Sequence, residues 1–186
     1  MALKQQAYLS LGSNLGERAL NLQKAVLEIA KKIGDVTAVS SVYENAAVGF
    51  EGGDFLNACI GVQTELSPSN LLQQLLQLEK DFGRERKSQT GYQSRTLDID
   101  ILLYGTEIVE DAALNIPHPS MQDRNFVLKP LADIAPQLYH PVLNKDIRNL
   151  LQECKDRNQL EKTKYKLYKS RLDLFSQLQF IAIEGN

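Results

Sequence analysis

Residues 7–33 read AYLSLGSNLGERALNLQKAVLEIAKKI, and this stretch decides the class of fold. Its first five residues, AYLSL, form a short apolar run typical of a strand, which stops at the turn Gly12-Ser13-Asn14. Beyond the turn, apolar residues recur at helical spacing, at Leu20, Leu22, Ala25, Val26, Ile29, Ala30 and Ile33. A strand, a tight turn and an amphipathic helix therefore open the chain.

Strands and helices continue to alternate after residue 33. Residues 36–43 are rich in β-branched side chains, and residues 55–64 and 96–104 also have strand character. Between the last two strands, Ser67-Pro68 opens a leucine-rich helix that we expect to end at Gly83. The order βαββαβ is that of the ferredoxin-like split unit. We therefore predict an α+β fold with a ferredoxin-like antiparallel sheet and helices packed on it, and a further helix over residues 144–154.

The composition argues against several classes of protein. The chain has 186 residues, of which 43% are hydrophobic and 24% charged, as in an ordinary globular domain. A net charge of -2 argues against a broad nucleic-acid-binding surface. No apolar run reaches the roughly 18 residues of a membrane span, and the start lacks a signal-peptide pattern, so we expect a cytoplasmic protein without a membrane partner. Cys59 and Cys154 form no C-x-x-C motif, and we interpret them as free thiols.

Two aspartates in the stretch RTLDIDI, residues 95–101, give the sharpest local signal. Residues two apart on a strand face the same side, so Asp98 and Asp100 project together, about 7 Å apart at their Cα atoms. Like charges this close repel, and Mg²⁺ ions that bridge to substrate phosphates are a common compensation. The pair also suits two metal ions. The alternative is two exposed acids on the polar face of a strand.

Basic residues flank the aspartate pair on both sides. The guanidinium group suits phosphate oxygens, so we expect a polyphosphate with Mg²⁺ to bind here. For each arginine taken singly, a solvated surface charge is the alternative. The cations are Arg84, Arg86, Lys87 and Arg95 before the pair, and His118 and Arg124 after it.

Two aromatic residues and an amide suggest a second subsite. Phe55, Asn57 and Phe126 can form an aromatic slot with an amide that both donates and accepts hydrogen bonds. Such a slot suits a flat heterocycle. The alternative for both phenylalanines is an ordinary place in the core.

Several segments together resemble the 6-hydroxymethyl-7,8-dihydropterin pyrophosphokinases of folate biosynthesis. They span roughly residues 7–152, and the motifs around the aspartate pair and around His118 are the most specific. The segments are YLSLGSNLGER, DFLNACIGVQTELSP, GRERK, SRTLDIDILLYG and IPHPSMQDRNFVLKPLADIAP.

The resemblance implies a reaction and a set of site residues. The reaction is transfer of a pyrophosphoryl group from ATP to the hydroxymethyl oxygen of the pterin, which gives AMP and the pterin diphosphate. Asp98 and Asp100 are implied as ligands of two Mg²⁺ ions and, with Arg84 and Arg95, as catalytic residues. The implied ATP-binding residues are Arg84, Arg86, Lys87, Arg95, Ile101, His118 and Arg124. The implied pterin-binding residues are Asn45, Val48, Phe55, Asn57 and Phe126.

The chain also departs from the family pattern. It has Asn45-Ala46-Ala47 where many members have Thr-Pro-Pro, and Tyr92 in a stretch where Trp-Gly-Pro-Arg is frequent. Other two-metal nucleotidyl or phosphoryl transferases, and a catalytically silent binder of small molecules, are the alternatives. A ferredoxin-like RNA-binding module would need an aromatic sheet signature that this chain lacks.

The composition changes near residue 154. Residues 155–171 carry seven basic and two acidic side chains, so we predict a domain over residues 1–154 and a basic helical linker or tail over residues 155–186. The chain ends in FIAIEGN, residues 180–186, which resembles the first strand and opening glycine of the P-loop of deoxynucleoside kinases. We expect a fused partner domain C-terminal to Asn186. The alternative is a C-terminal strand that pairs with its own or a neighbouring sheet.

Overall fold

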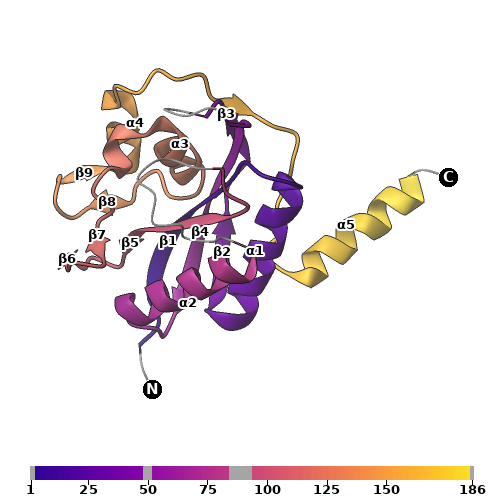
Figure 1. Cartoon of the computed structure of the whole chain (residues 1–186), viewed down its shortest axis with the longest axis horizontal. Coiled ribbons are helices and arrows are strands. Elements are labelled where there is room, and N and C mark those ends of the chain that lie inside the picture. The colour runs from indigo at the N-terminus through magenta and orange to yellow at the C-terminus, as the bar shows by residue number, and fades with distance from the viewer. Residues whose placement is uncertain (1–2, 48–51, 84–93, 185–186) are drawn as a thin grey trace.

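An antiparallel sheet organises the computed structural model, which describes residues 3–47, 52–83 and 94–184. Its three long strands are β1 (Gln5–Ser13), β4 (Phe55–Thr64) and β5 (Asp98–Tyr104). Three shorter strands complete it: β2 (Asp35–Val39), β3 (Tyr43–Asn45) and β10 (Glu161–Lys162). The strand order is β10-β3-β4-β1-β5, and β2 also pairs with β4. The prediction of a mixed helix and sheet domain with an antiparallel sheet is confirmed (Figure 1).

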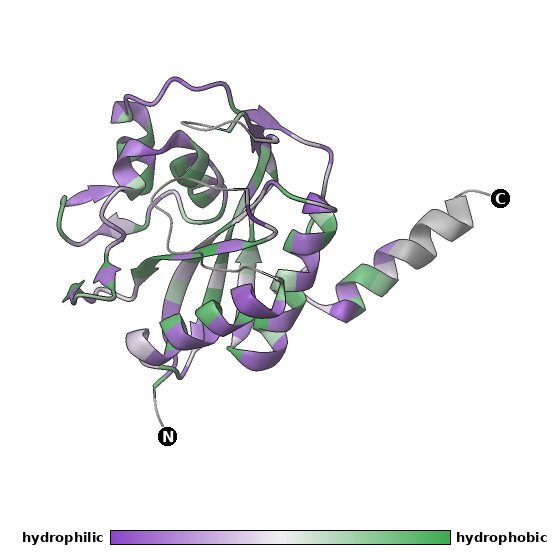
Figure 2. Ribbon diagram, in the orientation of Figure 1, coloured by the Kyte–Doolittle hydropathy of each residue, from purple (hydrophilic) through white to green (hydrophobic). Residues whose placement is uncertain are grey.

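One face of the sheet is covered by α1 (Arg18–Lys32) and α2 (Pro68–Asp81). Alternate strand residues such as Leu9, Leu11 and Ile60 are fully buried against the leucine and isoleucine face of these helices. Hydrophobic and hydrophilic residues alternate along both helices, as expected for helices with one buried side (Figure 2). Ser67 caps α2 by accepting the N–H of Asn70, as its sequence predicts.

The opposite face carries α3 (Asn125–Ile134) and α4 (Ile147–Glu153). They pack on Cys59 and Leu102 in a second hydrophobic cluster, which also buries Cys154. Both cysteines are free thiols. Tyr43 ties β3 to α3, because its hydroxyl donates to Asp133 at 3.0 Å. Burial and this carboxylate raise the pKa of Tyr43 to about 12.

Short elements connect these layers. The hairpin of β6 (Val109–Glu110) and β7 (Asn115–Ile116) leads into the 3-10 helix η1 (Met121–Asp123). The hairpin of β8 (Tyr139–His140) and β9 (Lys145–Asp146) lies between α3 and α4. None of the helices among the described residues is long and apolar enough to cross a bilayer.

The single strand predicted over residues 36–43 is in fact two strands. It breaks at Ser40, whose hydroxyl accepts the N–H of Cys59 at 2.9 Å in place of a backbone carbonyl. The register also shifts between Val36 and Ala38. A side chain that replaces a backbone acceptor interrupts a ladder locally, which propensity alone does not reveal.

The predicted conformation of the C-terminal segment is wrong in two places. Residues 155–170 are not helical, because β10 pairs with the otherwise open edge of β3 and the backbone of Tyr168 bonds to the side chain of Gln23. The strand expected at residues 180–183 lies instead within α5 (Arg171–Glu184), which projects from the rest of the molecule (Figure 1). A short apolar run does not distinguish a strand from a helix unless a partner strand is present.

His140 makes the stability of the fold sensitive to pH. It is buried, its Nδ1 accepts the N–H of Leu143 at 3.1 Å, and burial lowers its pKa. The unfolded chain therefore binds this proton more readily than the folded chain. The contribution of His140 is complete above about pH 6.5 and is lost as the pH falls below that value toward the lowered pKa.

We predict that His140→Asn weakens the pH dependence of the stability, because an amide oxygen can accept the Leu143 N–H without titrating. The free energy of unfolding, measured by urea titration at about pH 7.5 and about pH 5.5, should fall less in the variant than in the wild type. Equal losses in the two proteins would show that His140 does not carry the effect.

Candidate active site

A cavity of about 880 Å³ opens on the sheet face that carries α3 and also reaches Leu72, Leu76 and Glu79 of α2. Its floor is set by strand register, because Gly12 on β1 lies opposite Asp98 on β5 and opposite Asn57 on β4. Ser10 likewise lies opposite Asp100. Residues that oppose each other on neighbouring strands share a face, so these side chains point into one space. A Cβ at Gly12 would make an ordinary contact, 3.6 Å from Oδ1 of Asn57.

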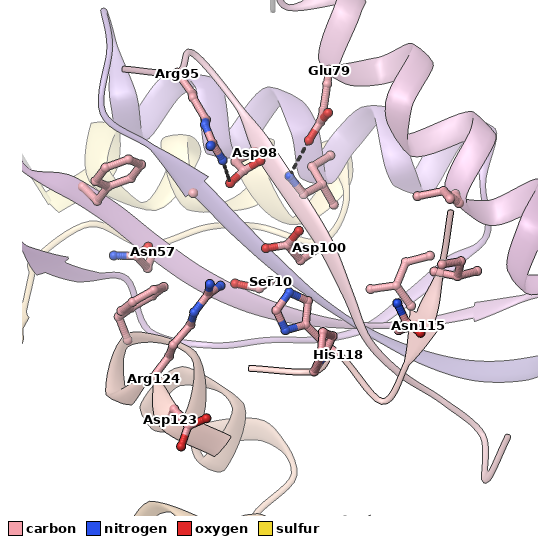
Figure 3. A pocket seen from close by; sticks show the side chains of 18 of the residues that line it. Ser10, Asn57, Glu79, Arg95, Asp98, Asp100, Asn115, His118, Asp123 and Arg124 are labelled. Atoms are coloured by element: carbon pink, nitrogen blue, oxygen red, sulfur yellow. Dashed lines mark hydrogen bonds and ion pairs between the residues drawn. The ribbon is translucent and has the colours of Figure 1, made fainter. Parts of the chain in front are cut away.

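The two aspartates lie side by side on this floor (Figure 3). Burial raises the pKa of the Asp100 carboxyl above its usual value, and the charge of Asp98 raises it further. His118, Arg124 and Arg95 oppose this shift. A buried carboxylate beside a second one favours the binding of a cation.

Arg95 forms an ion pair with Asp98 and is held in place by Asn14. The Oδ1 of Asn14 accepts the backbone N–H of Arg95 at 2.6 Å. The backbone N–H of Asn14 donates to the carbonyl of Arg95 at 3.0 Å. Its Nδ2 donates to the carbonyl of Gly53 at 3.2 Å and to Oγ of Ser94 at 3.3 Å. The turn predicted after the first strand therefore joins the segment before β4 to the segment before β5.

His118 and Arg124 approach Asp100 from the segment that leads into α3 (Figure 3). Burial lowers the pKa of His118, and Asp100 partly restores it. Its Nδ1 accepts the N–H of Ser120 at 3.2 Å, so Nε2 carries the proton of the neutral ring. Arg124 lies over the ring of Phe126, 5.8 Å from the centroid.

A pair of buried amides lies at another part of the cavity wall. Asn57 donates from Nδ2 to Oδ1 of Asn45 at 2.6 Å, and Asn45 donates to the carbonyl of Ala46 at 2.8 Å. These bonds fix the orientation of both amides. The strand β3 that carries Asn45 and the strand β4 that carries Asn57 and Phe55 are direct neighbours.

The structure brings many of the predicted site residues to this one cavity. Those that line it are Asn45, Phe55, Asn57, Arg95, Asp98, Asp100, Ile101, His118, Arg124 and Phe126. Four others lie outside the described residues, namely Val48, Arg84, Arg86 and Lys87. The individual roles of all of these residues stay predictions.

Other lining residues were not predicted. Glu79 on α2 is 2% exposed, and its Oε1 accepts the N–H of Ile99 at 2.8 Å, which supports β5 behind the aspartates. The signal was present, because Glu79 falls four residues after Leu75 on the apolar face of a helix. Asp156 and Asn158 also line the cavity, and nothing in their local sequence marks them.

The arrangement suits a phosphorylated ligand of nucleotide size. The volume is that of a small-molecule site, and carboxylates, cations and oriented amides converge on it. Among the described residues no three potential metal ligands cluster, so a metal ion would take only two carboxylates from this part of the chain. That donor set fits Mg²⁺, which keeps several water or phosphate ligands.

Comparison with known proteins identifies the family of this chain. Residues 8–136 match the family model described as 7,8-dihydro-6-hydroxymethylpterin-pyrophosphokinase (HPPK), and the chain belongs to this family. Its relatives include the 2-amino-4-hydroxy-6-hydroxymethyldihydropteridine pyrophosphokinase of Synechocystis, 44% identical over 79% of this chain and 75% of that protein. The protein of the same name from Aquifex aeolicus is 38% identical over 78% of this chain and 90% of its own length.

Solved structures share the fold. A triple mutant of the HPPK-DHPS protein of Plasmodium falciparum, in a crystal structure with pteroate, superimposes with a TM-score of 0.65 at 18% identity. The match covers 81% of this chain but only 43% of that longer one. At this identity the likeness supports the fold alone.

We predict that Asn14→Ala lowers the free energy of unfolding by about 2 kcal/mol, because it leaves the backbone N–H of Arg95 without its acceptor. Urea titration measures the loss. Asn21→Ala is the matched control, since Asn21 bonds to the same turn from a partly buried position. It should cost less than about 1 kcal/mol. Equal losses in the two variants would contradict a special role for Asn14.

Proposed function

We propose that this protein transfers a pyrophosphoryl group from ATP to 6-hydroxymethyl-7,8-dihydropterin, as a step of folate biosynthesis. The observation that carries the proposal is the meeting of Asp98 and Asp100 with Arg95, His118 and Arg124 in one cavity. Membership of the HPPK family supports the same reaction. The pterin hydroxymethyl oxygen bonds to the β-phosphorus of ATP, the bond from that phosphorus to the α,β-bridging oxygen breaks, and AMP leaves. The hydroxyl proton is released.

In this proposal Asp98 and Asp100 bind two Mg²⁺ ions. Bound there, the metal neutralises phosphate charge and orients the polyphosphate. The raised pKa of Asp100 supports this assignment, because a buried carboxylate beside Asp98 gains most from a cation. Ile101 contributes a contact to ATP from the same strand.

The cationic side chains bind the polyphosphate. Arg95, His118 and Arg124 come from two segments on opposite sides of Asp100, so they can grip a phosphate chain from both sides (Figure 3). Arg95 also serves directly in catalysis through charge stabilisation. Arg84, Arg86 and Lys87 have the same role in our proposal, with Arg84 also catalytic, although they lie outside the described residues.

The pterin occupies the end of the cavity near the amide pair. Asn45 and Asn57 hydrogen-bond its heterocycle, and Phe55 and Phe126 stack on it. Support comes from the fixed orientation of both amides and from the position of all four residues on the cavity wall. Val48 adds a backbone contact in this proposal and lies outside the described residues. Two substrates held in one cavity react with a large entropic advantage.

We extend the proposal to the topology of the sheet, the division of the chain, its location and a fused partner. The strand order β10-β3-β4-β1-β5 supports a ferredoxin-like topology, in which β10 is an added edge. Residues 1–154 form the catalytic domain and residues 155–186 the tail. We propose a cytoplasmic location. The occurrence of this fold within the longer HPPK-DHPS chains supports the proposal of a fused partner beyond Asn186.

The nucleotide products test the reaction. We predict that wild-type protein with Mg-ATP and the pterin forms AMP only when the pterin is present. Asp98→Asn and Asp100→Asn should each lower the rate on the order of 100-fold or more, because each removes a carboxylate charge from the metal site.

Asp35→Asn is the matched control, since Asp35 is an exposed strand aspartate paired with Lys4. Its rate should equal that of the wild type. Release of ADP or of free pyrophosphate in place of AMP would assign the protein to another class of phosphoryl or nucleotidyl transfer.

A further inference from the structure

Two residues of the segment 154–158 line the cavity, and this segment lies beyond the part of the chain matched by the family model, residues 8–136. Asp156 and Asn158 line the same cavity as Arg124 and Phe126. The segment starts at Cys154, which is 3% exposed within the α3 and α4 cluster. It is therefore anchored in the core before it reaches the cavity.

Asp156 contacts the first residue of α3. Its Oδ2 accepts the backbone N–H of Asn125 at 3.1 Å. In return, Nδ2 of Asn125 donates to the carbonyl of Asn158 at 2.9 Å, and Asn158 donates from its backbone N–H to Oδ1 of Asp156 at 3.0 Å. Asp156, Asn158 and Asn125 thus form a closed set of hydrogen bonds.

This contact supplies what the start of α3 lacks. Arg124 occupies the N-cap position, where Ser, Thr, Asp or Asn is preferred, and its side chain makes no capping hydrogen bond. A carboxylate at a helix N-terminus also interacts favourably with the helix dipole. Asn125 stands between Arg124 and Phe126, so the bond to Asp156 fixes the backbone that aims both side chains.

The chain beyond Asp156 is fastened to β3 and α1. It runs from α4 across to β3 and on toward α5 (Figure 1). There β10 pairs with Tyr43 and Glu44, the residues just before Asn45, and the N–H of Thr163 donates to the carbonyl of Val42 at 2.9 Å. Two side-chain bonds between Gln23 and the backbone of Tyr168, each 2.8 Å, hold its far end on α1. We name residues 154–168 the strap.

We propose that Asp156 is a positioning residue of the active site, which acts through Asn125 to hold Arg124 and Phe126 against the substrates, and that the strap is a structural part of the site. This inference rests on the proposed function. It assigns to the segment after the family match a role beyond that of a linker.

The test compares three variants at a temperature well below their unfolding midpoints. Asp156→Ala removes the acceptor, and Asp156→Asn keeps one oxygen for the Asn125 N–H. Asp146→Ala is the matched control, because Asp146 caps α4 by accepting the N–H of Asn149 at 2.8 Å and does not line the cavity. AMP formation gives kcat and KM for each substrate, and a thermal scan gives Tm.

We expect Asp156→Ala to lower kcat/KM about tenfold or more, through a higher KM for the pterin and a lower kcat. Asp156→Asn should recover most of this loss. Asp146→Ala should leave both kinetic constants within about twofold of the wild type while lowering Tm to a similar degree as Asp156→Ala. If the wild type is active and the two alanine variants have equal kcat and KM, the positioning role is wrong and the proposed function stands.

A second readout separates failure of this inference from failure of the proposed function. If the wild type forms no AMP, the proposed function is wrong. The variants are then compared by calorimetry, which measures their binding of a non-hydrolysable ATP analogue in the presence of Mg²⁺. Weaker binding to Asp156→Ala than to Asp146→Ala supports positioning of Arg124. Equal binding, or no binding to the wild type, overturns it.

Discussion

The site is governed by one electrostatic constraint, the presence of two carboxylates two residues apart on a strand inside a cavity. Asp98 and Asp100 cannot both carry charge there at low cost unless positive groups come near. Arg95 meets this need within the same segment through its ion pair with Asp98. His118 and Arg124 meet it from a distant segment. In the proposed reaction a phosphate-rich ligand and Mg²⁺ would complete the same balance, so one arrangement would serve both the folded state and that reaction.

The two faces of the sheet differ in role, since one forms the hydrophobic core and the other the floor of the cavity. Its α1 and α2 face is a continuous apolar core, in which residues such as Leu11 and Ile60 are fully buried. The other face is divided between the α3 and α4 cluster and the polar floor of the cavity. The alternation of side chains along β1 produces this division directly, since Leu9 and Leu11 face one side and Ser10 and Gly12 the other. Substitutions on the polar face are therefore expected to change ligand binding more than the stability of the fold.

The sequence predicted the main strands and helices because their apolar periodicity is strong and their ends carry caps or glycines. The aspartate pair was predictable for a similar reason, since its spacing alone sets the shared face. The break at Ser40 and the contact of Asp156 were not predictable, because each depends on a partner far along the chain. The residues of α5 illustrate the remaining ambiguity, since an apolar segment without a partner strand can form a helix.

The strap also orders events during synthesis. The sheet strands β1 to β5 and helix α3 precede it in the chain, and the strap leaves the ribosome after them. Until Asp156 reaches Asn125 and Tyr168 reaches Gln23, a nascent chain has the strands β1 to β5 and helix α3 but lacks the contacts of the strap. If the strap is part of the site as we propose, binding competence arrives late in translation, after the strands and helices that precede the strap in the chain.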